Sequence, residues 1–321
     1  MASSDNQPQW QRFQILSLDG GGIRGILSAA ILAAIEEDLG VRISDHFDLI
    51  AGTSTGGIIA LGLGLGLTPK EIVDFYISEG RSIFGDRFKL RSLKQYAASK
   101  FSAEPLAGAL RKCFKEQRFG DSRKRLVIPS YNLGDDDVYV FRTTHHQRLA
   151  RDYKVPAWKV GLATSAAPTY FPATREVDSI RLIDGGIWAN NPTMVAIIEA
   201  YGTLGVPLSS IRVLSLGTSE EICDRHRDLD VGGFWQWKTA AVDVVMRGQS
   251  LAATNHARFL IGKDNLLRIN PPVPSGVLAL DGIGRTADLV GKAAHYSRKE
   301  MPAIEQMIRG YLASEFIPIH T

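Results

Sequence analysis

The stretch from residue 47 to residue 61 has the pattern of a buried strand, a tight turn and a buried helix. Its first and last five residues are mostly apolar, and between them residues 52–56 read Gly-Thr-Ser-Thr-Gly. Because glycine lacks a Cβ atom, Gly52 and Gly56 can occupy a sharp turn that would crowd any other residue. Such a turn exposes the hydroxyl of Ser54 at the edge of a sheet, as in a nucleophile elbow, although an ordinary tight turn fits the bare pattern equally well.

Predicted strands and helices alternate along the whole chain, which argues for a mainly parallel α/β sheet covered by helices on both faces. No internal repeat or low-complexity linker interrupts the pattern, so we predict a single domain over residues 1–321, with a helical C-terminal portion, 237–321, packed on it. The predicted strands are 13–18, 47–51, 125–131, 138–143, 180–183, 211–216 and 266–269. The predicted helices cover 26–39, 68–79, 103–114, 155–163, 192–201, 237–259 and 287–312. One further helix is predicted to begin near residue 57.

Charge and cysteine content exclude several classes of protein. The net charge of +3 over 321 residues is too small to imply a nucleic-acid polymer as partner. The two cysteines, Cys113 and Cys223, provide neither a disulfide framework nor a metal site, and they suit a reducing cytoplasm. The first ten residues are polar and lack the apolar core of a signal peptide.

One uncharged stretch, residues 49–69, is long enough to cross a membrane. It contains the polar residues of the serine turn, and glycine recurs along it. A helix that begins at this turn and lies buried within the protein therefore explains the stretch better than a membrane span does.

A second glycine-rich turn, residues 19–25, reads Asp-Gly-Gly-Gly-Ile-Arg-Gly and separates the first predicted strand from a helix. Glycines at the positive end of a helix expose backbone N–H groups that suit an anion. Gly20, Gly22 and Gly25 fit the dinucleotide-binding pattern G-x-G-x-x-G, so a nucleotide-binding oxidoreductase of the Rossmann type is one alternative. Asp19 would repel a pyrophosphate, however, and no ribose-binding acid follows at the right distance. An oxyanion hole is therefore favoured.

Asp184, followed by two glycines, ends the predicted strand 180–183. Taken alone, the tripeptide is explained better by a plain Asp-Gly turn. A buried carboxylate at the carboxyl end of a parallel strand would, however, face the same crevice as Ser54. The residues Asn190-Asn191-Pro192 that follow are predicted to cap the next helix.

None of the seven histidines lies in a glycine-rich or strand-end context that would suggest a general base. We expect His145 and His146, in a polar run after a strand, to be solvated, and His256 lies inside a predicted helix. A serine–aspartate pair needs no histidine, because partial desolvation raises the pKa of an aspartate and lets it accept the serine proton. The sequence favours this pair and leaves a Ser-His-Asp triad open.

Taken in order, the motifs at 19–25, 52–56 and 184–186 resemble those of the patatin-like phospholipase family. The segment Ala163-Thr164-Ser165-Ala166-Ala167-Pro168, with Phe171-Pro172, resembles a further family block. The resemblance covers about residues 13–195, with no departure at a catalytic position.

This resemblance implies a three-layer α/β/α sandwich and a serine–aspartate dyad, with Ser54 as nucleophile and Asp184 as base. It also implies an oxyanion hole formed by Gly20, Gly21, Gly22 and Arg24. The implied activity is a phospholipase A type hydrolysis of membrane glycerophospholipids to free fatty acids. No calcium ion or other cofactor is expected.

In size, the chain resembles the cytoplasmic bacterial members of the family, some of which are effectors of CBASS antiphage defence that degrade the membrane once a cyclic nucleotide binds. This implies a cytoplasmic protein that acts at the inner face of the membrane, with a cyclic di- or trinucleotide as activator. A constitutive lipase or esterase is the alternative, and a homo-oligomer stays open. The segments 81–91 and 225–227 are rich in arginine and could contact phosphates, although solvated surface charge explains each of them better.

Residues 232–237, Gly-Gly-Phe-Trp-Gln-Trp, form an aromatic cluster behind two glycines. A mobile lid or an interfacial membrane anchor would use such residues, because indole prefers the headgroup region. A helix start with tryptophans in the core fits equally well.

Overall fold

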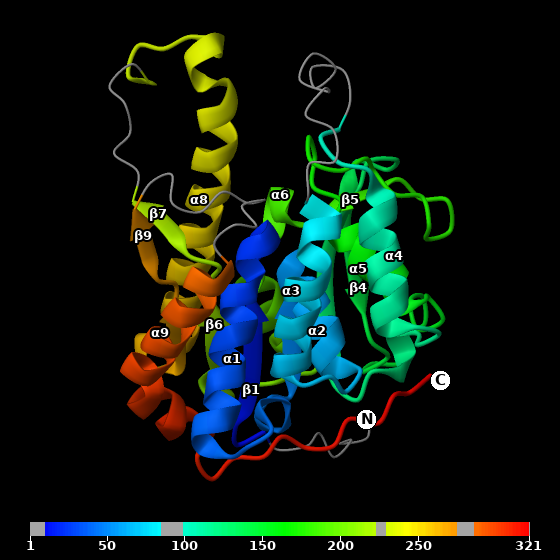
Figure 1. Cartoon of the computed structure of the whole chain (residues 1–321). Coiled ribbons are helices and arrows are strands. Elements are labelled where there is room, and N and C mark those ends of the chain that lie inside the picture. Colours follow the sequence, from blue (N-terminus) through cyan, green and yellow to red (C-terminus); the bar gives the residue numbers. More distant parts are fainter. Residues whose placement is uncertain (1–9, 85–98, 223–228, 275–285, 321) are drawn as a thin grey trace, which may run out of the picture.

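The protein is described here by a computed structural model that covers residues 10–84, 99–222, 229–274 and 286–320. Figure 1 shows a central sheet between helices. In these residues the sheet has seven strands, in the order β4-β3-β2-β1-β6-β8, and β5 pairs with β3 off this path. The strands are β1 (Phe13–Leu18), β2 (Leu49–Gly52), β3 (Arg125–Asn132), β4 (Asp137–Arg142), β5 (Leu182–Asp184), β6 (Ile211–Leu216) and β8 (Leu266–Ile269).

The sheet is mainly parallel, as predicted. Strand β1 runs parallel to β2 and β6, β2 to β3, and β6 to β8, whereas β4 and β5 run antiparallel to β3. The β3–β4 pair is antiparallel because only a short acidic turn joins the two strands, and a parallel pair needs a long crossover.

Helices cover both faces of the sheet, which confirms the predicted three layers (Figure 1). On β1, Leu16 and Leu18 belong to one buried cluster, whereas Phe13 and Ile15 belong to another on the opposite face. The first cluster includes side chains of α1 (Gly25–Leu39), α2 (Thr55–Gly64), α3 (Pro69–Phe84), α4 (Ala103–Phe114), α5 (Ala157–Thr164) and α9 (Thr286–Ile308). The second includes side chains of α7 (Thr193–Ile198) and α8 (Phe234–Ile261).

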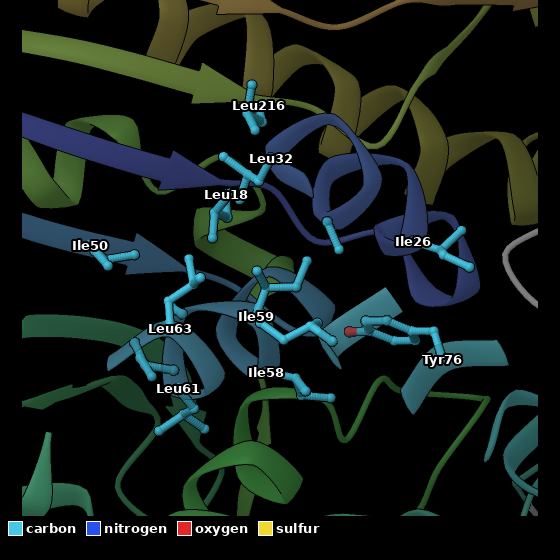
Figure 2. Close-up of a cluster of buried hydrophobic side chains, with 14 of the residues drawn as sticks. Leu18, Ile26, Leu32, Ile50, Ile58, Ile59, Leu61, Leu63, Tyr76 and Leu216 are labelled. Carbon is cyan, nitrogen blue, oxygen red and sulfur yellow. The ribbon is translucent and has the colours of Figure 1, made fainter. Parts of the chain in front are cut away.

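The larger cluster lies beneath the turn that follows β2. Figure 2 shows its aliphatic side chains gathered between the sheet and the helices, with α2 in the middle. Burial of each such side chain contributes roughly 1.5–3 kcal/mol to folding. The turn therefore rests on a well-packed base. The labelled residues are Leu18, Ile26, Leu32, Ile50, Ile58, Ile59, Leu61, Leu63, Tyr76 and Leu216.

The C-terminal part of the chain joins the same structure. Strand β8 extends the sheet beyond β6, and α9 packs against α1. The single domain over residues 1–321 stays a prediction, which these contacts support.

Several predicted boundaries differ from the structure. Helix α5 begins at Ala157 because Pro156 is its N-cap, and α8 begins at Phe234, three residues before the predicted start. The two-stranded parallel sheet of β7 (Glu220–Ile222) and β9 (Pro272–Pro274) was not predicted, since strands of three residues carry little periodicity. The remaining segments are α6 (Gly186–Ala189), a π-helix (Glu199–Thr203) and 3₁₀ turns at Gly22–Arg24, Ile43–His46, Phe119–Asp121, Leu208–Ser210 and Lys263–Asn265.

The uncharged stretch 49–69 forms strand β2, helix α2 and the start of α3, and most of it is buried within the protein. This agrees with the prediction that it is not a membrane span. Across the described ranges, every helix is either too short or too polar to cross a bilayer.

Candidate active site

Ser54 lies at the sharp turn between β2 and α2. Its backbone has φ +55° and ψ −123°, a conformation that costs a residue with a side chain of order 1–3 kcal/mol. The Ser54 N–H donates to Thr164 Oγ1 at 3.0 Å, and the Thr164 hydroxyl donates to Pro129 O at 2.6 Å. The packed base and these hydrogen bonds hold the serine in its strained conformation.

The two glycines that flank this turn are required by space. A Cβ on Gly52 would lie 2.1 Å from the Gly56 oxygen, and a Cβ on Gly56 would lie 2.2 Å from the Leu18 oxygen. Both contacts are with backbone atoms, which cannot move aside as a flexible side chain would. The turn of the nucleophile-elbow pattern therefore tolerates only glycine at these positions.

Asp184 accepts a hydrogen bond from the Ser54 hydroxyl, although 130 positions separate the two residues in the sequence. Strand β5 runs antiparallel to β3, so that Asp184 pairs with Ser130 near the carboxyl end of β3. The prediction that Asp184 ends a parallel strand is therefore wrong, yet its carboxylate still reaches the end of the sheet where Ser54 lies.

The Asp184 carboxylate is buried, and burial raises its pKa to about 6. Two hydrogen bonds act in the opposite direction, one from the Ser54 hydroxyl and one from the Gly186 N–H at 2.6 Å. Because its pKa is raised while it remains ionised near neutral pH, Asp184 is a better proton acceptor than a solvated carboxylate.

Residues 20–24, called the glycine loop below, lie against Ser54. A Cβ placed on Gly20 would be 3.2 Å from the Ser54 Cβ. In the part of the chain that the structure describes, the N–H groups of Gly21 and Gly22 have no acceptor. The loop leads directly into α1, and Gly22 has a φ of +59°. Two available N–H groups at the start of a helix, next to a hydroxyl, are suited to an anion.

Gly20 and Arg24 differ from Gly21 and Gly22 in what they contribute. The Gly20 N–H already donates to Asn190 O at 3.0 Å, so it is not available to an anion. The Arg24 N–H and Nε both donate to Gly21 O, at 3.2 and 3.4 Å, and brace the loop from within. Of the four residues predicted for an oxyanion hole, two therefore present N–H groups; the role itself stays a prediction.

Sequence reasoning missed the residues that hold the site in place. Thr164 lies in the resembling block 163–168, but nothing in the sequence says that its hydroxyl meets the Ser54 N–H. Asn190 was interpreted only as part of a helix cap. The Asn191 side chain does accept from the Thr193 N–H at 3.1 Å, whereas the Asn190 oxygen holds the glycine loop.

The prediction that His145 is solvated is wrong. Its side chain is buried, with Nε2 3.0 Å from Glu199 Oε1 and Nδ1 3.0 Å from Thr143 Oγ1, and burial lowers its pKa. A polar stretch of sequence does not show that its side chains are exposed, because partners such as Glu199 can come from far along the chain. His256 lies on α8 and is exposed. Within the described ranges, no histidine is hydrogen-bonded to Ser54 or Asp184.

Two further predictions fall partly or wholly outside the described residues. The arginine-rich segment 225–227 lies outside the described residues. Of the segment 81–91, only residues 81–84 are described. In the aromatic cluster 232–237, the side chains of 234–236 are also outside, whereas Trp237 is 36% exposed and its Nε1 donates to Leu229 O at 3.1 Å. No cluster of metal-binding side chains is found among the described residues.

A mainly parallel sheet between two helical layers, with a serine on a strained strand–helix turn beside a buried aspartate, is the architecture of an α/β serine hydrolase. The comparison with protein families is more specific. The family model "Patatin-like phospholipase" matches residues 16–197, more than half of the chain. The chain belongs to the patatin-like phospholipase family. This membership replaces the oxidoreductase alternative for the glycine loop.

Similar proteins occur in bacteria and plants. A "cGAMP-activated phospholipase" of Pseudomonas aeruginosa is 31% identical over 90% of this chain and 89% of that protein. A protein of the same name from Vibrio cholerae is 33% identical over 67% of this chain and 68% of that protein. "Patatin-like protein 1" of Arabidopsis thaliana is 32% identical over 87% of this chain and 78% of that protein.

Proposed function

We propose that this patatin-like phospholipase hydrolyses the acyl esters of membrane glycerophospholipids with Ser54 as nucleophile and Asp184 as general base. The observation that carries the proposal is the hydrogen bond from the Ser54 hydroxyl to a buried carboxylate whose pKa is raised to about 6 by burial. Next to this pair, the N–H groups of Gly21 and Gly22 are available to an oxyanion.

In the first half of the reaction, Asp184 takes the proton of the Ser54 hydroxyl while Ser54 Oγ bonds to the ester carbonyl carbon. The carbonyl oxygen becomes negatively charged, and the N–H groups of Gly21 and Gly22 stabilise it. The ester C–O bond then breaks, and the leaving lysophospholipid oxygen takes the proton from Asp184. The fatty acyl group remains on Ser54 as an ester.

In the second half, a water molecule takes the place of the serine hydroxyl as the group that Asp184 deprotonates. Asp184 takes a proton from the water, and the water oxygen bonds to the acyl carbon. The bond from this carbon to Ser54 Oγ breaks, Ser54 recovers the proton, and the free fatty acid leaves. No step requires a metal ion or a histidine.

The activity is tested by incubating the full chain with phospholipid vesicles and quantifying free fatty acid by mass spectrometry. We expect Ser54→Ala to release no more fatty acid than a protein-free blank. His256→Ala, a change at an exposed residue, should retain the wild-type rate. Full hydrolysis by Ser54→Ala would contradict the nucleophile assignment, and a comparable loss in His256→Ala would favour a triad.

We further propose that a cyclic di- or trinucleotide activates the enzyme in antiphage defence, in the cytoplasm and at the inner face of the membrane. The support comes from relatives named cGAMP-activated phospholipase, one of which aligns over 90% of this chain.

Regulation is tested by repeating the vesicle assay with a panel of cyclic di- and trinucleotides, cGAMP included. We expect at least about a tenfold rise in rate with one member of the panel, which corresponds to a decrease of about 1.4 kcal/mol in activation free energy. The linear form of the same nucleotide is the control. An equal and substantial rate with and without every nucleotide would instead support a constitutive lipase.

A further inference from the structure

A buried ion pair connects the glycine loop to a strand outside the segment that the family model matches. Asp19 stands directly before the loop, and Arg268 lies on β8. Arg268 Nη1 donates to Asp19 Oδ1 at 2.8 Å, and Nη2 donates to Asp19 Oδ2. Because the guanidinium holds both carboxylate oxygens, it fixes the orientation of Asp19 as well as its distance.

The Arg268 side chain reaches Asp19 across strand β6. In the sheet, β8 lies next to β6 and β6 next to β1, and Arg268 is paired in register with Ser215. Arg268 Nη1 also donates to Ser215 Oγ at 2.8 Å, and Ser215 Oγ lies 3.0 Å from Thr193 Oγ1. The Arg268 side chain is only 8% exposed, so buried partners rather than solvent determine its position.

The end of β6 and the residues after it also hold the backbone of the loop. The Asp19 N–H donates to Leu216 O at 3.0 Å, and the Thr218 hydroxyl donates to Gly20 O at 2.9 Å. A Cβ on Gly21 would lie 2.1 Å from Thr218 Oγ1, so the loop packs directly against this threonine. The position of the loop therefore depends on Leu216, Thr218 and Arg268, all of which follow the matched segment.

The sign of the charge next to the loop also matters. During attack on an ester, negative charge develops on the oxygen that the Gly21 and Gly22 N–H groups would face. An ionised Asp19 opposes that charge, whereas an arginine is always ionised and compensates Asp19. Arg268 can thus act on the reaction in two ways, by geometry and by charge, without touching the substrate.

We propose that Arg268 is a positioning residue for ester hydrolysis: through Asp19 it orients the N–H groups of Gly21 and Gly22 and compensates the carboxylate next to them. This proposal rests on the function proposed above. It assigns part of the site to a strand that contains none of the glycine motifs.

Four variants of the full chain test this role with a p-nitrophenyl ester of a fatty acid in mixed micelles. Arg268→Met removes the charge and the fork, Arg268→Lys keeps only the charge, and the double variant Asp19→Asn/Arg268→Met removes both charges. Arg142→Met is the matched control, because Arg142 also pairs with a buried carboxylate, that of Glu199 at 3.4 Å. It lies on β4, at the opposite end of the strand order from β8. Values of kcat and KM are corrected for the folded fraction from urea unfolding.

We expect Arg268→Met to lower kcat about 100-fold, the loss typical of a misplaced catalytic group, with KM changed less than about twofold. Arg268→Lys should lose about tenfold, because it lacks the bidentate fork. The double variant should be about tenfold more active than Arg268→Met, because it no longer carries the Asp19 charge that Arg268 compensates in wild type. Arg142→Met should keep the wild-type kcat for each folded molecule.

A kcat within threefold of wild type for folded Arg268→Met would overturn the proposal, and so would a loss in Arg142→Met equal to that in Arg268→Met. If Arg268→Met does not fold, the lysine and double variants decide: a wild-type kcat in either Arg268→Lys or the double variant contradicts the role. Failure of the proposed function is distinguishable, because wild type would then release no p-nitrophenol beyond the rate of Ser54→Ala, either with or without the cyclic nucleotides of the panel.

Discussion

Two buried aspartates lie at opposite ends of the parallel strands, and their pKa values are raised by the same cause. Asp48 stands just before β2, and Asp184 meets Ser54, which follows β2. Burial raises the pKa of both carboxylates. The partners differ: Asp184 binds a hydroxyl and one glycine N–H, whereas Asp48 Oδ2 accepts from the Gln14 N–H at 2.7 Å and from the Tyr311 hydroxyl.

The partners of Asp48 belong to the scaffold. Tyr311 lies in the C-terminal tail, the described residues 309–320 that follow α9. Figure 1 shows this tail passing beneath the amino ends of the strands. The tail is also held by His46 Nδ1, 2.6 Å from Tyr311 O, and by the Ala313 N–H, which donates to Asp45 O at 2.8 Å. A raised pKa alone therefore does not identify a catalytic carboxylate. What distinguishes Asp184 from Asp48 is its neighbours: a hydroxyl on a strained turn and the available N–H groups of the glycine loop.

The largest effect that separates the two aspartates is expected from Asp184→Asn. The amide cannot accept the serine proton, so we expect kcat in vesicle hydrolysis to fall by about 10²–10⁴-fold. Stability at pH 7 should not fall, because the change removes a buried charge and keeps an acceptor for the Gly186 N–H. Initial rates and urea unfolding measure the two quantities. If Asp48→Asn lowered kcat as much, the distinction between the two sites would be lost.

The pH dependence of Asp184 should have opposite signs for activity and stability. Its pKa is about 6 in the folded protein and near the ordinary 3.8 in the unfolded chain, so the folded state binds the proton more tightly. As pH falls through 6, kcat should fall about tenfold per unit, because the protonated carboxyl cannot act as base.

Over the same range, the stability contribution of Asp184 should rise, reach its full value below about pH 3.8 and be lost again as pH rises through 6. The measurement is the difference in unfolding free energy between wild type and Asp184→Asn from pH 7 to pH 4. We expect this difference to shift in favour of wild type on acidification. A difference that is independent of pH would show that Asp184 does not titrate near 6.

A smaller effect, on stability alone, is expected from Asp48→Ala. The change leaves the Gln14 N–H without its buried acceptor and the Tyr311 hydroxyl without one partner, which costs about 1–3 kcal/mol. Urea unfolding gives this loss, and kcat per folded molecule should stay within about twofold of wild type. A hundredfold lower kcat in folded protein would mean that the amino end of the sheet acts on the catalytic end.

The smallest effect is expected from Tyr311→Phe. It removes only the hydroxyl, which has two acceptors within reach, Asp48 Oδ2 and, at 3.1 Å, Arg12 O, so we expect a loss of about 1 kcal/mol in unfolding free energy. Tyr296→Phe, a change in α9 without a hydroxyl bond to Asp48, is the control. Equal stability of the two variants would show that the tail is not held through Asp48.

Much of this fold follows from the sequence because its signals are local. The buried strands 13–18 and 211–216 were predicted with the bounds of β1 and β6, since apolar runs between turn residues are visible in any short window. The turn at 52–56 was likewise predicted, because a close approach of backbones leaves room only for glycine.

The support of the site could not be predicted, because it depends on pairs far apart in the sequence. Arg268 binds Asp19 across 249 positions, and the Gly20 N–H donates to the Asn190 backbone oxygen across 170 positions (190 − 20), so no local pattern encodes either contact. The antiparallel direction of β5 was missed for the same reason. His145 was misjudged because its acceptor, Glu199, lies 54 positions away.

The central claim, that Ser54 is a nucleophile activated by Asp184, is tested most directly by the rate at which a fluorophosphonate labels the protein. The phosphorus of the reagent bonds to an activated hydroxyl and loses fluoride. The phosphonyl oxygen then occupies the place of the oxyanion. We predict one adduct, mapped by peptide mass spectrometry to Ser54, with a rate that falls below pH 6 in wild type and is at least about 100-fold lower in Asp184→Asn. An adduct on another residue, or equal labelling of Ser54 in Asp184→Asn, would contradict the account.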